Sequence, residues 1–395
     1  MLFRALADEN IPFACEALGT VAAEVRCAPR GGLTPADVAG ADVLWVRSVT
    51  PVGPELLEDA RRLQFVGSAT AGTDHVDRAF LRRRGIAFAH APGSNAPSVA
   101  DYVVAALLAV AARREEALRG KTAAVVGCGE VGSRVARRLE ALGLRVLRND
   151  PPRAEAAERE GHAHDFRPLD DVLPAADIAT LHTPLTTGGA HPTRRLLGED
   201  RLAAMPAGAW LVNTARGGVV DGAALRAVRE SEHLGAAVLD VWPGEPAPDP
   251  ALVARADVAT PHIAGYAFDG KVRGTAMLYR ALCEHLGTAP QWHAEDVLAA
   301  PGDAFRLSGA PGASFGETTA LDALARQMYD VRTDDRRLRR ALDAASSTEE
   351  RAAAFAQLRR DYPRRRAFAR YCLAGESVPP ARRVAVKEGL GVRLC

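Results

Sequence analysis

The glycine-rich segment "AVVGCGEVGSRVARRLEALG", residues 124–143, is the feature that most restricts the fold of this chain. An apolar strand pattern precedes the turn, an amphipathic helix pattern follows it, and a second strand pattern ends at Asp150. Gly127, Gly129 and Gly132 have the G-x-G-x-x-G spacing. In this context the first glycine makes the turn, the second leaves room for a pyrophosphate, and the third lets the helix pack on the strand. The segment therefore predicts a Rossmann-like parallel α/β unit that binds a dinucleotide.

The position of Asp150 favours NAD as the dinucleotide. Its carboxylate would accept hydrogen bonds from the ribose hydroxyls and repel a 2′-phosphate. Arg148 and Arg153 lie nearby and leave the preference over NADP open. Glu130 places an acid inside the glycine turn, where we expect its side chain to point away from the phosphates. The structural alternative is a tight strand–helix turn followed by an ordinary acid at a strand end.

Two series of alternating strand and helix patterns indicate two doubly wound parallel-sheet domains. A long helix capped by Ser98 separates the series, and a helix from about Phe268 to His285 follows the second. The Pro- and Gly-rich stretch from 287 to 317 predicts loops, and the last seventy residues have a helical pattern. We expect a substrate-binding domain at 1–98 and 268–286, an NAD-binding domain at 99–267, and a smaller C-terminal domain at 287–395.

The expected strands of the two series have the following sequences: "FRALA", "DVLWVRS", "LQFVGSAT" and "IAFAHAP" in the first, then "TAAVVG", "RVLRND", "DIATLHTPL", "AWLVNTA", "GAAVLDVW" and "DVATPHIAG" in the second.

Composition excludes several classes of function. A net charge of +1 gives no overall basic field for nucleic acid or membrane, and we expect neither as a partner. The six cysteines form no C-x-x-C pair and accompany no histidine cluster, so we expect no metal site and no disulfide framework. The N-terminus "MLFRALADENIPF" carries charges where a signal peptide needs an apolar run. The apolar stretch 102–112 is too short to span a bilayer. The sequence thus predicts a cytoplasmic protein in a reducing environment.

Three polar residues follow the ends of strand patterns in the second series. Arg216 follows "AWLVNTA", Glu245 follows "GAAVLDVW", and His262 follows "DVAT". Ligands bind at this edge of open α/β sheets. A histidine can take a hydroxyl proton during hydride transfer, a carboxylate can orient it, and an arginine can bind a carboxylate through two parallel hydrogen bonds. The three residues together predict oxidation of a 2-hydroxy acid.

Each of these residues also has a structural interpretation when it is taken alone. The histidine can be a structural hydrogen-bonder, the glutamate a solvated turn residue, and the arginine a tie to a neighbouring loop. Asp240 would accept from the nicotinamide carboxamide, or it is an ordinary turn aspartate. Thr183 would line the cofactor cleft, or it is a turn residue before Pro184.

The motifs "GCGEVG", "LHTPLT", "NTARGGVVD", "LDVWPGEP" and "PHIAGY" resemble the D-isomer-specific 2-hydroxyacid dehydrogenases over residues 1 to 285. The resemblance implies two Rossmann-like domains with the active site between them. It assigns the substrate carboxylate to Arg216 and the proton transfer to His262 and Glu245. It also implies cofactor contacts at Asp150, Thr183, Asp240 and Gly265.

Further segments are similar to a branch of this family that oxidises a phosphorylated four-carbon acid in vitamin B6 biosynthesis. They are "LWVRSVTPV", "FVGSATAGTDHVD", "PGSNAPSVADYV" and the tail from "MYDVRTDDRRLRRAL" onward. The similarity implies a homodimer formed by the C-terminal domain, and substrate contacts at Ser48, Thr70 and Tyr266. Arg47, at a strand end of the first series, is the first candidate for the phosphate, or it is a surface arginine. Residues 364–366, all arginine, are expected to form a solvated basic face, with reach into a neighbouring subunit's site as the alternative.

Two other functions stay open from the sequence. The residues at the strand ends do not separate the four-carbon phosphate from phosphoglycerate, glyoxylate or another small hydroxy acid. The same fold also serves proteins that bind NAD as a signal without turnover.

Overall fold

The computed structural model describes residues 3–28, 32–298, 305–308 and 317–395 of the 395-residue chain. The chain divides into two compact units. The first unit contains residues 1–95 and 267–303, and the second contains residues 96–266 and 304–395.

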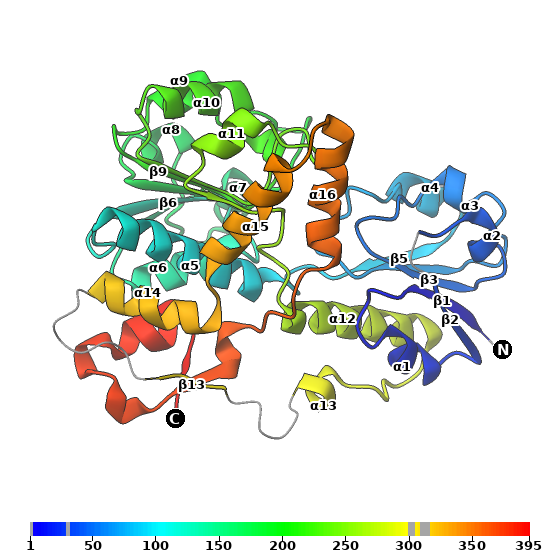
Figure 1. Ribbon diagram of the computed structural model, residues 1–395. Helices are drawn as coiled ribbons and strands as arrows, with labels where there is room; N and C mark the ends of the chain where they lie inside the picture. The colour runs from blue at the N-terminus through cyan, green and yellow to red at the C-terminus, as the bar shows by residue number, and fades with distance from the viewer. Residues whose placement is uncertain (1–2, 29–31, 299–304, 309–316) are drawn as a thin grey trace. The chain divides into compact units, whose positions relative to one another are not determined.

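The first unit is built on a five-stranded parallel sheet with the strand order β2-β1-β3-β4-β5 (Figure 1). Its strands are β1 (Arg4–Asp8), β2 (Glu24–Ala28), β3 (Val43–Val46), β4 (Phe65–Ser68) and β5 (Ala87–His90). Its helices are α1 (Ala14–Gly19), α2 (Pro35–Val38), α3 (Pro54–Leu57), α4 (Arg78–Arg83), α12 (Phe268–Leu286) and α13 (Ala294–Leu298). Alternate residues of β3 enter two different apolar clusters, Leu44 in one and Trp45 in the other. Helices therefore cover both faces of this sheet.

The second unit has a six-stranded parallel sheet with the order β11-β10-β9-β8-β6-β7. Its strands are β6 (Thr122–Val126), β7 (Arg145–Asn149), β8 (Ile178–Leu181), β9 (Trp210–Asn213), β10 (Ala236–Leu239) and β11 (Val258–Ala259). Its sheet-flanking helices are α5 (Ala96–Arg114), α6 (Gly132–Ala141), α7 (Pro151–Glu160), α8 (Leu169–Val172), α9 (Glu199–Ala203), α10 (Gly222–Glu230) and α11 (Pro250–Arg255). The strand order reverses beside β6, and such a switch point forms a crevice that binds ligands.

The C-terminal segment, residues 304–395, belongs to the second unit and contains the helices α14 (Glu317–Met328), α15 (Val331–Asp343) and α16 (Thr348–Arg360). A small parallel sheet joins β12 (Phe305–Arg306), β13 (Tyr371–Leu373) and β14 (Arg393–Leu394). α14 and α15 pack against α5 (Figure 1). Leu321, Leu324 and Phe368 enter the same buried cluster as the apolar residues of α5. The segment thus covers an apolar surface of helix α5.

Helix α5 is long and apolar enough to be considered as a membrane span by length and composition, and 83% of its apolar window is buried inside the protein. This burial is typical of the central helix of a globular core. The helix begins at Ala96, and Ser98 is a fully buried residue within it, so the expected cap at Ser98 is wrong.

The predicted fold of two parallel α/β sheets is confirmed. Strand β2 and the small β12–β14 sheet were not predicted. A helix, α13, and strand β12 lie in the stretch that was expected to form loops, while residues 299–304 and 309–316 of that stretch lie outside the described part.

The expected absence of a disulfide framework is also wrong. Cys15 of α1 is bonded to Cys27 of β2, and Cys372 of β13 is bonded to Cys395 after β14. Each bond joins two neighbouring elements. The bonded cysteines are 12 and 23 residues apart in sequence, a separation that no short cysteine motif indicates.

Candidate active site

The glycine turn between β6 and α6 has the geometry that a dinucleotide requires. Gly127 has a φ of +85°, which side chains disfavour, and it closes the turn after β6. A Cβ on Gly132 would lie 1.8 Å from the carbonyl oxygen of Gly127, so the third glycine is required for packing. A Cβ on Gly129 would meet nothing within 4 Å. The turn is therefore tight where helix meets strand and open where the pyrophosphate would approach.

Asp150 lies beside this turn, at the end of β7. Its Oδ2 accepts a 2.8 Å hydrogen bond from the backbone N–H of Cys128. Burial and the Asp150 carboxylate raise the pKa of the Cys128 thiol to about 11, which keeps the thiol neutral next to the phosphate position. Arg148 is paired with Glu140 and Asp165, so its charge is already neutralised. Arg153 Nε lies 3.7 Å from Asp150 Oδ2, so the acid at the ribose position is itself paired with a cation.

Glu130, the acid within the turn, points outward as expected. Its side chain is 57% exposed and forms a 2.7 Å ion pair with Arg134, one turn along α6. Glu130 therefore adds little repulsion toward a bound pyrophosphate.

Thr183 and Asp240 follow β8 and β10 at the same edge of the sheet. The Thr183 hydroxyl oxygen is buried and has no hydrogen-bond partner in the described part of the chain, as expected for a group that awaits a ligand. Asp240 is only 1% exposed. Its Oδ1 accepts from the Thr260 hydroxyl and the Ile263 N–H, and its Oδ2 accepts from the Ala264 N–H. Asp240 thus fixes the loop that carries His262.

His262 lies in this loop with a φ of +58°, an uncommon conformation for a residue with a side chain. The loop compensates for the strain, because the His262 N–H donates to the Asp240 carbonyl over 2.8 Å. His262 Nδ1 and Glu245 Oε2 are 2.7 Å apart. This contact orients the imidazole and leaves Nε2 for the reaction.

Glu245 is held from two sides. Its Oε1 accepts a 2.7 Å hydrogen bond from the Trp242 N–H, while its Oε2 contacts His262. Burial alone would raise the pKa of Glu245, but the hydrogen bond and charge of His262, the Trp242 amide and the charge of Arg359 together lower it below its usual value. Glu245 is therefore ionised at neutral pH and can stabilise a positive imidazolium.

Arg216 follows β9 in a turn that Asn213 organises. Asn213 accepts from the Ala215 N–H and donates to the Arg216 carbonyl, both over 3.1 Å. Gly217 comes next, where a Cβ would lie 2.0 Å from the backbone of Trp242. The glycine thus allows the turn of Arg216 to approach the turn of Glu245.

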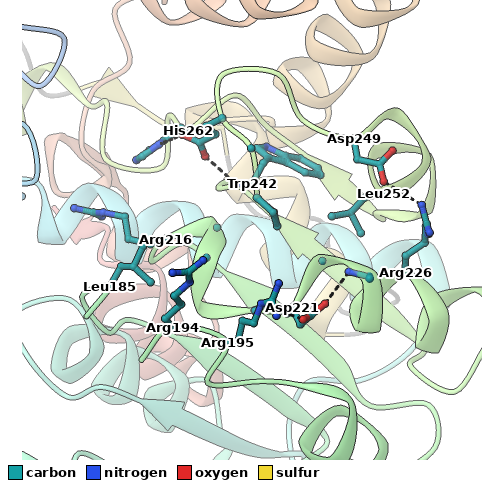
Figure 2. Close-up of a pocket in the computed structure, with 18 of the residues that line it drawn as sticks. Leu185, Arg194, Arg195, Arg216, Asp221, Arg226, Trp242, Asp249, Leu252 and His262 are labelled. Carbon is teal, nitrogen blue, oxygen red and sulfur yellow. Dashed lines mark hydrogen bonds and ion pairs between the residues drawn. The ribbon is translucent and has the colours of Figure 1, made fainter. Parts of the chain in front are cut away.

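One cavity of about 720 Å³ in the second unit collects the predicted residues. Arg216, Glu245 and His262 all line it, as Figure 2 shows for the two labelled residues Arg216 and His262. Arg194 and Arg195 also line it, on the loop after β8. The lining contains four arginines and three carboxylates, and Arg216 is its candidate partner for an anionic substrate.

The C-terminal segment contributes to the site in a way that the sequence did not reveal. Arg365 is 7% exposed and donates to the carbonyls of Ile263 and Ala264, over 3.1 and 2.6 Å. Arg366 is also buried, at 9% exposure. The expectation of a solvated basic face at 364–366 is therefore wrong for these two residues.

The first unit places its candidate residues at the ends of neighbouring strands. Arg47 and Ser48 follow β3, and Thr70 follows β4. Arg47 Nη1 donates to the Asn10 carbonyl over 3.3 Å. The Thr70 hydroxyl donates to the Gly72 carbonyl over 2.9 Å. Among the described residues of both units, no group of three or more His, Cys, Asp or Glu side chains is arranged to hold a metal ion.

Comparison with known proteins agrees with this geometry. Residues 100–264 match the family "D-isomer specific 2-hydroxyacid dehydrogenase, NAD binding domain", and residues 312–386 match a domain family of unknown function. The chain is 55% identical to an erythronate-4-phosphate dehydrogenase of Salinibacter ruber over 98% of both chains. It is 46% identical to that of Azotobacter vinelandii over 95% of this chain and 96% of the relative.

Solved structures show the same fold. The TT0316 protein from Thermus thermophilus is 31% identical with a TM-score of 0.62, over 73% of this chain and 98% of that one. A D-lactate dehydrogenase from Aquifex aeolicus, solved with NAD and lactic acid, is 25% identical with a TM-score of 0.58, over 72% of this chain and 95% of that one. The chain belongs to the D-isomer specific 2-hydroxyacid dehydrogenases and, within them, to the erythronate-4-phosphate dehydrogenase family. Its cofactor is NAD, which the open glycine turn and Asp150 fit.

Proposed function

We propose that this chain oxidises 4-phospho-D-erythronate at C2, using NAD, to (R)-3-hydroxy-2-oxo-4-phosphooxybutanoate in vitamin B6 biosynthesis. The observation that carries the proposal is the 2.7 Å His262–Glu245 contact in the same cavity as Arg216. The identity to erythronate-4-phosphate dehydrogenases along nearly the whole chain supports the choice of substrate.

The three residues have separate roles in the reaction. Arg216 binds the substrate carboxylate, and two parallel hydrogen bonds fix its orientation. Nε2 of His262 takes the proton of the C2 hydroxyl while the C2–H bond breaks and the C2=O bond forms. NAD, when bound, would supply the hydride acceptor that oxidation at C2 requires. The charge of Glu245 stabilises the imidazolium that His262 becomes.

The remaining contacts are proposed from position and chemistry. Gly127, Gly129 and Gly132 would admit the pyrophosphate, and Asp150 would bind the adenosine ribose. Thr183, Asp240 and Gly265 would contact the nicotinamide half of the cofactor. Arg47, Ser48, Thr70 and Tyr266 would contact the substrate, with Arg47 as the first unit's candidate for the phosphate.

We also propose a homodimer in the cytoplasm. The C-terminal segment would form the interface, and Val384 of that segment is 60% exposed although it is apolar. Light scattering of the intact chain tests the dimer and should give twice the chain mass. Removal of the segment is a poor test, because its leucines share a core with α5. Thiol titration of protein from cell extract would show whether the two disulfides form in the cytoplasm.

NADH formation tests the activity. Purified protein and NAD would receive 4-phospho-D-erythronate, 3-phosphoglycerate or D-glycerate in parallel, with a 2-oxo acid acceptor in duplicate samples in case NADH stays bound. We expect turnover with the four-carbon phosphate alone. Turnover only with another acid would support the mechanism and contradict the substrate assignment. NAD binding without any turnover would favour a sensor.

A further inference from the structure

Helix α16 positions Arg359 near the loop that contains His262 and Tyr266 in the same unit. Phe355 of α16 is fully buried in the core beneath the six-stranded sheet's helices, and Leu358 packs against the same cluster. Arg359 comes one helical turn after Phe355 and therefore lies on the same face. The helix anchor thus fixes the direction in which the Arg359 side chain leaves the backbone.

The Arg359 guanidinium lies over the ring of Tyr266, with its central carbon 5.7 Å from the ring centroid. Tyr362 contacts the same ring edge-on, at a centroid distance of 5.7 Å. Tyr266 comes four residues after His262, in the loop that Arg365 holds through two carbonyls. The C-terminal segment thus places a cation over Tyr266, four residues after His262 in its own chain.

Within the described part of the chain, the guanidinium of Arg359 makes no hydrogen bond or ion pair, and its Nε is buried without a partner. Other arginines of the segment are paired, such as Arg332 with Asp322 and Arg339 with Asp335. Leaving a half-buried cation unpaired is unfavourable unless an anion completes the site. The electrostatic effect of Arg359 on Glu245 supports its closeness to the catalytic pair.

We propose that Arg359 binds the phosphate group of the substrate and is a specificity-determining residue. The inference rests on the proposed function and identifies where that site distinguishes a phosphomonoester from a plain hydroxy acid. The substrate carries two anionic groups, and Arg216 accounts for the carboxylate. A phosphomonoester carries a charge of about −1.5 to −2 at neutral pH and favours an arginine partner. The segment matched by the domain of unknown function, residues 312–386, would thus complete the active site.

The test compares two substrates that differ only in the phosphate. kcat/KM is measured with 4-phospho-D-erythronate and with D-erythronate for the intact enzyme and the variants R359M, R359K, R360M and R194M. Arg360 is the matched control, because it is the exposed neighbour of Arg359 on the same helix. Arg194 is the competing candidate, because it lines the cavity. Calorimetry with inorganic phosphate on the NAD-loaded enzyme and on R359M gives a readout that does not need turnover.

We expect R359M to lower kcat/KM for the phosphorylated acid about 50-fold, the scale of one lost charge-assisted pair, and to change D-erythronate oxidation less than twofold. R359K should recover part of the loss, and R360M should change neither substrate. Phosphate should bind the intact enzyme more tightly than R359M. An equal loss with both substrates, no loss with either, or a phosphate-selective loss in R194M alone would overturn the inference. If the intact enzyme does not oxidise 4-phospho-D-erythronate, the proposed function fails. Separately, equal phosphate binding by the intact enzyme and R359M would overturn the role of Arg359.

Discussion

The loops that follow the carboxyl ends of the strands differ between the two parallel sheets. We call these loops the first rim in the first unit and the second rim in the second unit. In the second unit, Asp240 and Arg365 both bond to the loop of His262, and each is less than a tenth exposed. In the first unit, Ser48 is exposed and the apolar Val49 is 71% exposed. The first rim therefore has fewer constraints on its side chains than the second.

This difference matches two demands on an active site. Proton transfer needs an imidazole held in one orientation, because small misplacements of a catalytic group cost rate. Recognition of a flexible acid tolerates exposed side chains that adjust on binding. We therefore expect substitutions in the second rim to affect kcat strongly, and substitutions in the first rim to affect mainly KM.

The largest effect is expected from His262→Ala. Loss of the general base should lower kcat about 10³-fold while NAD affinity, measured by calorimetry, stays close to that of the intact enzyme. His162, which is 71% exposed, provides the control H162A with unchanged turnover. A parallel loss of NAD affinity in H262A would show that His262 is structural.

Arg216→Lys comes next. Lysine keeps the charge and loses the two-pronged contact, so kcat/KM should fall about 100-fold in steady-state assays. The control is Arg226→Lys, because Arg226 lines the same cavity and pairs with Asp249 at 3.3 Å. Unchanged kinetics in R216K would remove its carboxylate role.

Arg365→Met tests the tie on the catalytic loop. The Ala264 carbonyl would lose the Arg365 donor, and the Ile263 carbonyl would keep the Tyr266 N–H but lose Arg365. We therefore expect a loss of about 2 to 3 kcal/mol in the free energy of unfolding and a roughly tenfold lower kcat. The exposed neighbour Arg364→Met should change stability by less than about 0.5 kcal/mol. Denaturant melts and assays of both variants check this. An unchanged kcat in R365M would show that the loop of His262 keeps its position without Arg365.

His182, which follows β8, is expected to make the stability of the fold depend on pH. Burial lowers the pKa of His182 to about 3, from an ordinary value of 6.5. Between these two values the unfolded chain binds the proton and the folded chain does not. Stability should therefore fall as pH drops from 6.5 toward 3, by up to about 1.4 kcal/mol per pH unit. The variant His182→Gln should lose this part of the slope in unfolding experiments, and an identical slope would contradict the assignment.

The smallest effect is expected in the first rim. Ser48→Ala should raise KM for the four-carbon phosphate about fivefold with little change in kcat, the scale of one neutral hydrogen bond. Val49→Ala serves as the control and should leave KM unchanged. A kcat loss as large as that of R365M would mean that the two rims are equally constrained.

Much of the second rim was predictable, because its catalytic residues directly follow strands that an apolar pattern predicts. Arg216, Glu245 and His262 each follow such a strand, and the structure brings all three to one cavity. Strand β2 was missed because it is an edge strand with mostly exposed residues, so it lacks the apolar run that marks buried strands.

Long-range contacts explain the remaining differences. Nothing local to Arg365 indicates that it will be buried, because its acceptors are carbonyls about a hundred residues earlier in the chain. The disulfide partners are likewise joined by the pairing of elements, as when Cys372 of β13 meets the strand beside Cys395. A sequence pattern indicates local periodicity, and it does not indicate which distant backbone groups need a donor.

The most direct test of the account follows the hydrogen at C2. The enzyme would oxidise 4-phospho-D-erythronate that carries deuterium at C2, and mass spectrometry would measure the NADH that forms. We expect NADH heavier by one mass unit, because the C2 hydrogen moves to the cofactor as hydride. NADH of ordinary mass, or no NADH at all, would contradict oxidation at C2 by this site.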